Sequence, residues 1–458
     1  MLDQPWLRGD QWRRTDPRIS ELESCPLRLS HLDDVLRQIP LSEGIFSILG
    51  PRQVGKSTLL HLLAIEILKT LPPAAVALVE GDAIESWREI LSLLTDYLDR
   101  IPPGRIRAAL LIDEITSVPE WHRAVKLLAD RGTLKGVLLV YTGSSSRLNR
   151  FSRSLKEGGE FLPGRRGRHP ITNFEVAPAS YRHVASRLSL ETYFKVGGFP
   201  WAVNEYLRLK SIPPHVGEIY WGWLKGEFLK RGKSDLLLRH LVQSLVRRVG
   251  TPFSHNKLAQ ETGIASHETA RQYLELLQDC YAVNELFWID PSRHLIAPRK
   301  NRKYYPVDPF LYHLFRESGL SPWNEAPLSS TEEGKLAELV VCQELRQRAP
   351  NRSDLLGYWS AQREIDFMTS PPRTGKAGCI GSNRGANPDS PPDTPHRDNI
   401  SSKCGIEVKY QNRVIPGEFQ WFEKSFPKDD LLILTKNDSF SLGRIRAMPL
   451  KTWLLASD

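Results

Sequence analysis

The sequence has few cysteines and no long apolar run. Its 5 cysteines are scattered through 458 residues, odd in number and without C-x-x-C spacing. This pattern argues against a disulfide framework and a zinc site, and it predicts reduced thiols. Residues 1–16 lack the apolar core of a signal peptide, and no later window approaches a membrane span. We therefore expect a cytoplasmic protein with no membrane partner.

Positive charge is in excess. The formal net charge is +9 and the pI is about 9.2. Such a surface suits a polyanion such as double-stranded DNA, but it also occurs on proteins that are simply soluble. The length exceeds what one hydrophobic core usually fills, and it predicts about three domains.

Residues 50–58, GPRQVGKST, match G-x-x-x-x-G-K-[ST] without a mismatch. The apolar run 45–49 before them predicts a buried strand, and residues 59–65 predict a helix. Backbone N–H groups in such a loop point at a polyphosphate. Lys56 would reach the β- and γ-phosphates of ATP, and the Ser57 hydroxyl would ligate Mg²⁺. The alternative is a glycine-rich turn that binds nothing. The predicted nucleotide-binding residues are Gly50, Pro51, Arg52, Gln53, Val54, Gly55, Lys56, Ser57 and Thr58.

A second motif is an apolar strand, residues 107–112, that ends in Asp113 and Glu114. We expect Asp113 to hold Mg²⁺ and Glu114 to polarise the attacking water. Two carboxylates at a strand end also occur in solvated turns, which is the competing interpretation. Further apolar strands at 75–80 and 137–142 alternate with helical patterns, which predicts a parallel sheet with helices on both faces.

The order of several motifs resembles that of a known family, the prokaryotic AAA-type ATPases with a C-terminal domain of uncharacterised function. The motifs are Asp113-Glu114, Trp121 in a helix, Gly143-Ser144-Ser145-Ser146, Gly164-Arg165 and Gly197-Gly198-Phe199-Pro200. The resemblance implies a γ-phosphate sensor at Thr142 or Ser144, although a serine-rich helix cap explains these serines as well. It also implies a winged helix and a PD-(D/E)XK nuclease-like domain after the ATPase core.

We therefore predict an α/β protein that begins with a P-loop NTPase sheet and ends with a small α/β nuclease-like domain. The predicted segments are an N-terminal extension 1–32, an AAA-type core 33–185, a helical lid 186–235, a winged helix 236–312, a linker 313–330 and a nuclease-like domain 331–458. The tract at about 369–403 is rich in Pro, Gly, Ser and Asn, which predicts a disordered insert.

The winged-helix prediction depends on helical patterns at 236–249, 257–262 and 266–277, the last with Ser266 as N-cap. Residues 282–289 and 294–296 suit a two-stranded wing, and residues 299–303 form a basic patch. Such a unit would grip DNA through its phosphates. Winged helices also serve as protein-packing modules, so both interpretations stay open.

In the C-terminal segment the family pattern identifies Glu338 in a helix, Asp366 in a strand, and Glu407 with Lys409 in a later strand. Glu338, Asp366 and Glu407, with the Val408 carbonyl, would ligate Mg²⁺, and Lys409 would activate water. The alternative is a nuclease-like fold that does not cleave.

Two functions follow. The first is an ATP-hydrolysing, Mg²⁺-dependent machine that acts on DNA. The second is an ATP-dependent switch that recruits partner proteins through a non-cleaving C-terminal domain. An arginine supplied in trans would imply a homo-oligomer, but the sequence does not assign that task to Arg165, Arg166 or Arg168.

Overall fold

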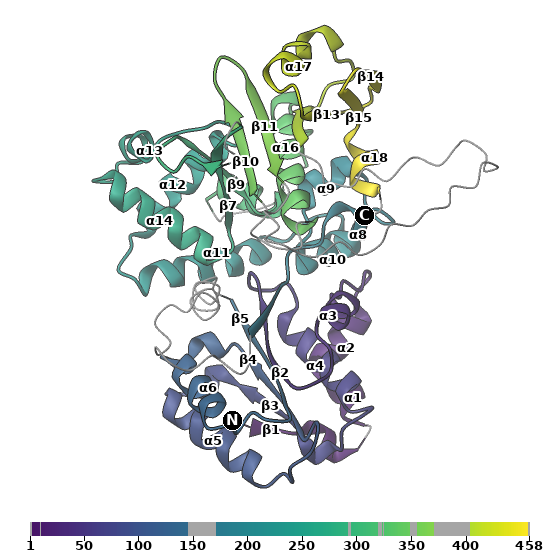
Figure 1. The fold of residues 1–458 in the computed structure, drawn as a ribbon, viewed down its shortest axis with the longest axis vertical. Coiled ribbons are helices and arrows are strands. Elements are labelled where there is room, and N and C mark those ends of the chain that lie inside the picture. The colour runs from purple at the N-terminus through teal and green to yellow at the C-terminus, as the bar shows by residue number, and fades with distance from the viewer. Residues whose placement is uncertain are drawn as a thin grey trace, which may run out of the picture. The chain divides into compact units, whose positions relative to one another are not determined.

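The computed structural model describes residues 2–9, 11–144, 171–291, 295–318, 323, 325–348, 355–370 and 404–456. The arginines at 165, 166 and 168 and most of the predicted insert lie outside these ranges. The chain divides into two compact units (Figure 1). The first unit comprises Met1–Gln243, Ala259–Val283 and Pro306–Glu325, and the second comprises Ser244–Leu258, Asn284–Tyr305 and Ala326–Asp458. Within the described ranges, no helix is both long and apolar enough to cross a membrane.

A six-stranded sheet forms the centre of the first unit. Its order is β1-β3-β4-β5-β2-β6, in which β1 runs antiparallel to β3 and every other neighbouring pair is parallel. The predicted parallel sheet is therefore confirmed. The strands are β1 (Leu2–Asp3), β2 (Gly44–Leu49), β3 (Val76–Glu80), β4 (Ala108–Asp113), β5 (Val137–Gly143) and β6 (Ile171–Glu175).

Helices cover both faces of this sheet (Figure 1). Helices α5 (Trp87–Asp99) and α6 (Trp121–Asp130) place apolar side chains against β3, β4 and β5, where Leu94, Leu110 and Leu128 are fully buried. Helix α4 (Lys56–Ile67) packs on β4 and β5, and α2 (Pro17–Ser24) and α3 (Leu32–Gln38) pack on α4. Helix α1 (Trp12–Thr15) precedes them.

The remainder of the first unit is helical, and the assignment of residues 186–235 as a lid stays a prediction. The tight sequence Gly197-Gly198 joins α9 to α10. A Cβ atom on Gly198 would lie 1.8 Å from the Ala179 carbonyl oxygen, and the Gly198 N–H donates to Asp308 Oδ2 at 2.9 Å. The helices are α8 (Tyr181–Val184), α9 (Leu190–Val196), α10 (Pro200–Leu209), α11 (Pro214–Leu229), α14 (His267–Asp279) and α15 (Pro309–Arg316), while α12 (Asp235–Arg247) and α13 (His255–Thr262) contribute to both units.

The elements expected of the winged helix are present. Ser266 caps α14 by accepting the Thr269 N–H, and β7 (Val283–Asp290) pairs antiparallel with β8 (Leu295–Ile296). Residues 236–312 are nevertheless shared between the two units, and their assignment as one winged-helix domain stays a prediction. Helix α15 begins at Pro309, where Asp308 caps it, and it ends at Arg316. The first residues of the predicted linker, from 313, are therefore helical.

The second unit contains a nine-stranded sheet with the order β14-β15-β13-β12-β11-β10-β7-β8, and β9 (Arg302–Pro306) also pairs with β7. Helix α16 (Ser330–Arg348) is buried on all sides in its middle, from Leu339 to Leu345. Helix α17 (Trp421–Ser425) adds Phe422 to an apolar cluster with Ile365 and Ile433. The other elements are β10 (Leu355–Ser360), β11 (Glu364–Ser370), β12 (Cys404–Lys409), β13 (Asp430–Thr435), β14 (Phe440–Leu442), β15 (Ile445–Pro449) and α18 (Leu450–Leu455).

Candidate functional site

The predicted nucleotide-binding residues follow the carboxyl ends of neighbouring parallel strands. Strand β5 lies between β2 and β4, with Leu49 opposite Gly143 and Ile112 opposite Tyr141. The loop after β2 and the acids that end β4 therefore meet at one edge of the sheet. The chain changes direction across the sheet here, because β2 lies between β5 and β6, and such a switch point is the usual ligand site of an open α/β sheet.

Two glycines of the loop are required by its shape. Gly50 has φ +159°, and a Cβ atom there would lie 2.1 Å from the Val176 carbonyl oxygen. Gly55 has φ +91° and is the N-cap residue of α4, a left-handed conformation that side chains disfavour. The loop therefore leads directly into α4, and the free N–H groups at the N-terminus of a helix favour the binding of anions.

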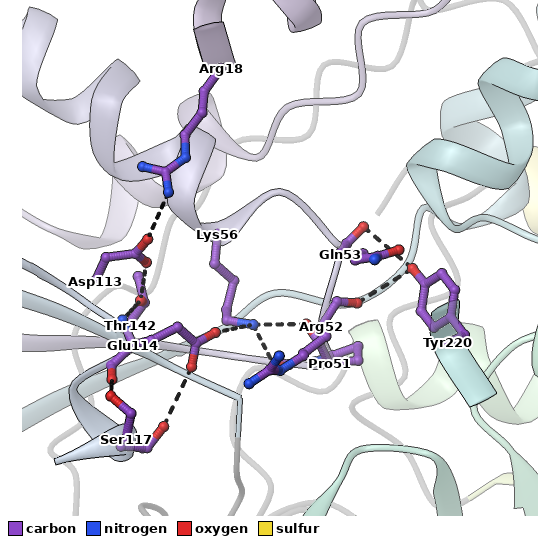
Figure 2. A network of polar contacts seen from close by, with 12 residues as sticks. Arg18, Pro51, Arg52, Gln53, Lys56, Asp113, Glu114, Ser117, Thr142 and Tyr220 are labelled. Atoms are coloured by element: carbon purple, nitrogen blue, oxygen red, sulfur yellow. Dashed lines mark hydrogen bonds and ion pairs between the residues drawn. The ribbon is translucent and has the colours of Figure 1, made fainter. Parts of the chain in front are cut away.

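Lys56 is buried at this edge and turns back over the loop (Figure 2). Its Nζ donates to the carbonyl oxygens of Gly50 at 3.0 Å and Pro51 at 2.8 Å, and lies 3.5 Å from Glu114 Oε1. Burial lowers the pKa of Lys56, while the neighbouring Glu114 and Asp113 carboxylates oppose that shift. The predicted Lys56 and Glu114 are therefore brought together.

Thr142 joins the two acids that end β4. Its hydroxyl donates to Asp113 Oδ1 at 2.7 Å and accepts the Glu114 N–H at 2.7 Å. Glu114 adopts a left-handed conformation with φ 45°, which turns its side chain toward Lys56. Thr142 is fully buried, so in this structure it positions the acids, and its predicted contact with nucleotide stays a prediction. Ser144, the other sensor residue, follows β5 and is half-buried.

Arg18, which the sequence did not single out, extends from α2 toward the same carboxylate (Figure 2). Its Nη2 lies 3.6 Å from Asp113 Oδ2, and its Nη1 donates to His61 Nε2 at 2.9 Å. A guanidinium only donates, so His61 carries its hydrogen on Nδ1 and donates it to Asp16 Oδ2 at 2.6 Å. Asp16 also caps α2. The chain Asp16–His61–Arg18 thus fixes a positive charge beside Asp113.

The rest of the loop lies as the motif requires. Ser57 and Thr58 occupy the first turn of α4 and are half-buried, and Val54 is buried. Tyr220 of α11 donates from its hydroxyl to the carbonyl oxygens of Arg52 at 3.4 Å and Gln53 at 3.5 Å (Figure 2). The helical segment after the sheet therefore contacts the loop directly.

The predicted C-terminal site also comes together, in the second unit. The Val408 N–H donates to Asp366 Oδ2 at 2.9 Å, and the Asp366 N–H donates to Glu407 Oε2 at 3.3 Å. Lys409 Nζ lies 2.8 Å from Glu407 Oε1. Burial and the Asp366 charge raise the pKa of Glu338 to about 7 and that of Glu407 to about 8.

A lysine that the sequence assigned elsewhere completes this cluster. Lys303 was expected in a basic patch facing phosphates, but its side chain is fully buried and its Nζ lies 3.1 Å from Glu338 Oε1 and 3.0 Å from Asp366 Oδ1. The prediction is wrong for this residue because β9 is paired within the sheet. In the part of the chain that is described, no group of three or more His, Cys, Asp or Glu side chains could hold a metal ion.

The third helix of the predicted winged helix carries little free positive charge. Arg271 is held by ion pairs to Glu268 and Glu275, one turn away on either side. His267 and Gln272 are exposed. To contact a base or a phosphate of DNA, Arg271 would have to break both ion pairs. DNA binding by this helix therefore stays a prediction.

Comparisons with known proteins agree with the geometry of the first unit. Residues 42–184 match the model of an AAA domain, and residues 187–322 match the model of a domain of unknown function, DUF8612. No curated protein matches. Among solved structures, two RuvB variants from Thermotoga maritima share 15% and 16% identity, with TM-scores of 0.28 and 0.26; the matches cover 58% and 61% of this chain and 92% and 91% of theirs. At TM-scores this low the likeness does not extend to function. The segment 42–184, which includes the loop and the paired acids, is therefore similar to an AAA domain.

Proposed function

We propose that the protein binds ATP with Mg²⁺ at the P-loop and hydrolyses it. The observation that carries the proposal is the convergence of Lys56, Glu114 and Asp113 at the carboxyl ends of β2 and β4. Thr142, on the strand between them, is hydrogen-bonded to both acids. A structural turn would not need a buried lysine facing a glutamate across two strand ends.

The donor atoms at this edge suit magnesium. The Ser57 hydroxyl opens α4, and the Asp113 carboxylate is aimed by Thr142, so both supply the hard oxygen ligands that Mg²⁺ prefers. Ser57 and Asp113 would hold Mg²⁺ there, and the ion would supply positive charge to offset the charge of the phosphates. Lys56 would exchange its loop carbonyl partners for phosphate oxygens, and Glu114, released from Lys56, would accept a proton from the attacking water.

Substitution of Lys56 tests the proposal. Lys56→Ala should abolish binding of a fluorescent ATP analogue and phosphate release, because the phosphate contact is lost. Lys69→Ala is the matched control. Lys69 is an exposed lysine just beyond α4 that pairs with Glu66, three residues before it. ATP turnover by pure Lys56→Ala protein at the wild-type rate would remove the assignment.

For the C-terminal part, we propose docking of a partner rather than cleavage of DNA. Two contacts favour this proposal. Lys303 pairs with Asp366, one of the acids expected to hold a metal, and Arg271 pairs with Glu268 on its own helix. An ATP-dependent switch with a docking domain therefore agrees better with these contacts than a nuclease does. A shift of labelled DNA by the wild-type protein that weakens steeply with salt would instead support a nucleic-acid partner. Assembly into a homo-oligomer stays a proposal, because the arginine loop lies outside the described residues.

A further inference from the structure

The second unit buries one lysine among carboxylates. The Lys303 Nζ lies 2.5 Å from Glu364 Oε1, 3.0 Å from Asp366 Oδ1 and 3.1 Å from Glu338 Oε1. Its side chain has no exposed surface. Burial alone disfavours an ammonium ion, but the Glu338, Asp366 and Glu364 carboxylates all lie within 3.1 Å of the nitrogen and compensate its charge. The lysine is therefore the cation of this buried cluster.

The carboxylates around Lys303 are held from their other sides as well. The Tyr305 hydroxyl donates to Glu338 Oε1 at 2.5 Å, and the Val408 N–H donates to Asp366 Oδ2. Glu338 also lies against the main chain of Gly250, where a Cβ atom would approach Glu338 Oε2 to 2.5 Å. This close approach and the φ of +82° both require glycine there. Glu338 is thus held by two segments of the second unit, β9 and the chain at Gly250.

This arrangement does not fit the magnesium site that the sequence predicts. Oxygen ligands bind Mg²⁺ at about 2.0–2.1 Å and in octahedral geometry. Here the oxygens of Glu338 and Asp366 that face each other already share an ammonium ion. A divalent cation at the same oxygens would lie within a few ångströms of the lysine charge, in a buried region where like charges repel strongly. Either cation can neutralise these acids, but not both.

We propose that Lys303 is a built-in cation that takes the place of a divalent metal at Glu338 and Asp366, so that the second unit binds no Mg²⁺ there and does not cleave phosphodiesters. Inside the fold, these acids and Lys303 neutralise each other. Lys409 likewise neutralises an acid of the predicted site, because its ammonium group pairs with Glu407 and not with a water molecule bound to metal.

The experiment measures Mn²⁺ binding to the nucleotide-free, full-length protein by electron paramagnetic resonance. Wild type, Asp366→Asn, Lys303→Met and the double variant Lys303→Met/Asp366→Asn are compared, with Lys300→Met as control because Lys300 is exposed on the same segment. We expect wild type, Asp366→Asn and Lys300→Met to bind Mn²⁺ equally weakly. Lys303→Met should bind one ion on the order of tenfold more tightly, since the competing charge is gone, and the double variant should lose that gain.

Three results would overturn the inference. The first is a wild-type Mn²⁺ site that Asp366→Asn removes, and this comparison decides the matter even where Lys303→Met does not fold. The second is a folded Lys303→Met protein with no added site. Nicking of DNA or RNA by the wild type with Mg²⁺ or Mn²⁺, lost in Asp366→Asn, would likewise contradict it. None of these outcomes depends on ATP binding at Lys56, so this inference and the proposed ATPase are tested separately.

Discussion

Arg18 and Asp113 face each other, with Nη2 and Oδ2 separated by 3.6 Å (Figure 2). The arginine comes from the second helix of the chain, and His61 holds it at the other end of its guanidinium group. The carboxylate is buried, whereas the arginine is about one-third exposed. A residue from the N-terminal extension thus interacts with the acid on which metal binding is expected to depend.

This pairing predicts competition between Arg18 and Mg²⁺ for Asp113. Arg18→Ala should lower the Mg²⁺ concentration that gives half-maximal ATP turnover by about threefold, since a partly exposed ion pair contributes about 0.5–1 kcal/mol. A Mg²⁺ titration of the ATPase rate at saturating ATP measures it. Arg14→Ala is the control, because Arg14 is exposed on α1. A collapse of kcat at saturating Mg²⁺ would show instead that Arg18 contacts the phosphates.

Glu114 should separate hydrolysis from binding. Glu114→Gln keeps the shape of the side chain but removes the base, so kcat should fall on the order of 10²–10⁴-fold while ATP binding stays near that of the wild type. Phosphate release and binding of a fluorescent ATP analogue are measured on the same preparation. Glu120→Gln, at an exposed residue six positions downstream, should leave both unchanged. Equal loss of binding and turnover would mean that Glu114 mainly supports Lys56.

Thr142 should matter for both stability and rate. Thr142→Val leaves the Glu114 N–H without its acceptor and frees Asp113 Oδ1, at a cost of about 1–3 kcal/mol in the free energy of unfolding. The thermal midpoint should fall, and kcat should fall with it because both acids lose their orientation. Thr142→Ser keeps the hydroxyl and should restore most of each property. A Val variant with wild-type kcat would show that the two acids are positioned by the strand alone.

The parts of this site that the sequence predicted are those encoded locally. The loop that contains Lys56 lies between a strand and a helix, and Asp113 and Glu114 end an apolar run, so short windows specify both. Register between β2, β5 and β4 then brings them together, which a parallel sheet makes necessary. The element boundaries expected for these strands and for α14 agree with the structure to within about two residues.

The residues that the sequence missed act over long separations. Nothing near Arg18 indicates Asp113, because the contact depends on how α2 packs against α4. Lys303 follows other basic residues and therefore resembles part of an exposed patch. Only the pairing of β9 with β7 turns its side chain into the interior of the second unit. Burial of a charge among acids from a helix and another strand has no signature in a local window.

Replacing glycine by alanine should have opposite effects on stability at Gly198 and at Gly222, two positions of the first unit. Gly198→Ala would place a Cβ atom 1.8 Å from the backbone oxygen of Ala179, a contact that the side chains nearby cannot relieve. The thermal midpoint of the protein should fall by several degrees, because the chain must move away from Asp308, which accepts the Gly198 N–H. Gly222→Ala lies in the interior of α11, is exposed and meets no atom within 4 Å, so it should raise stability by about 0.5–1 kcal/mol through helix propensity. Differential scanning fluorimetry of the two variants decides the matter, since a neutral Gly198→Ala would mean that the segment from Gly197 to Pro200 tolerates a side chain and that its glycines are not needed for the fold.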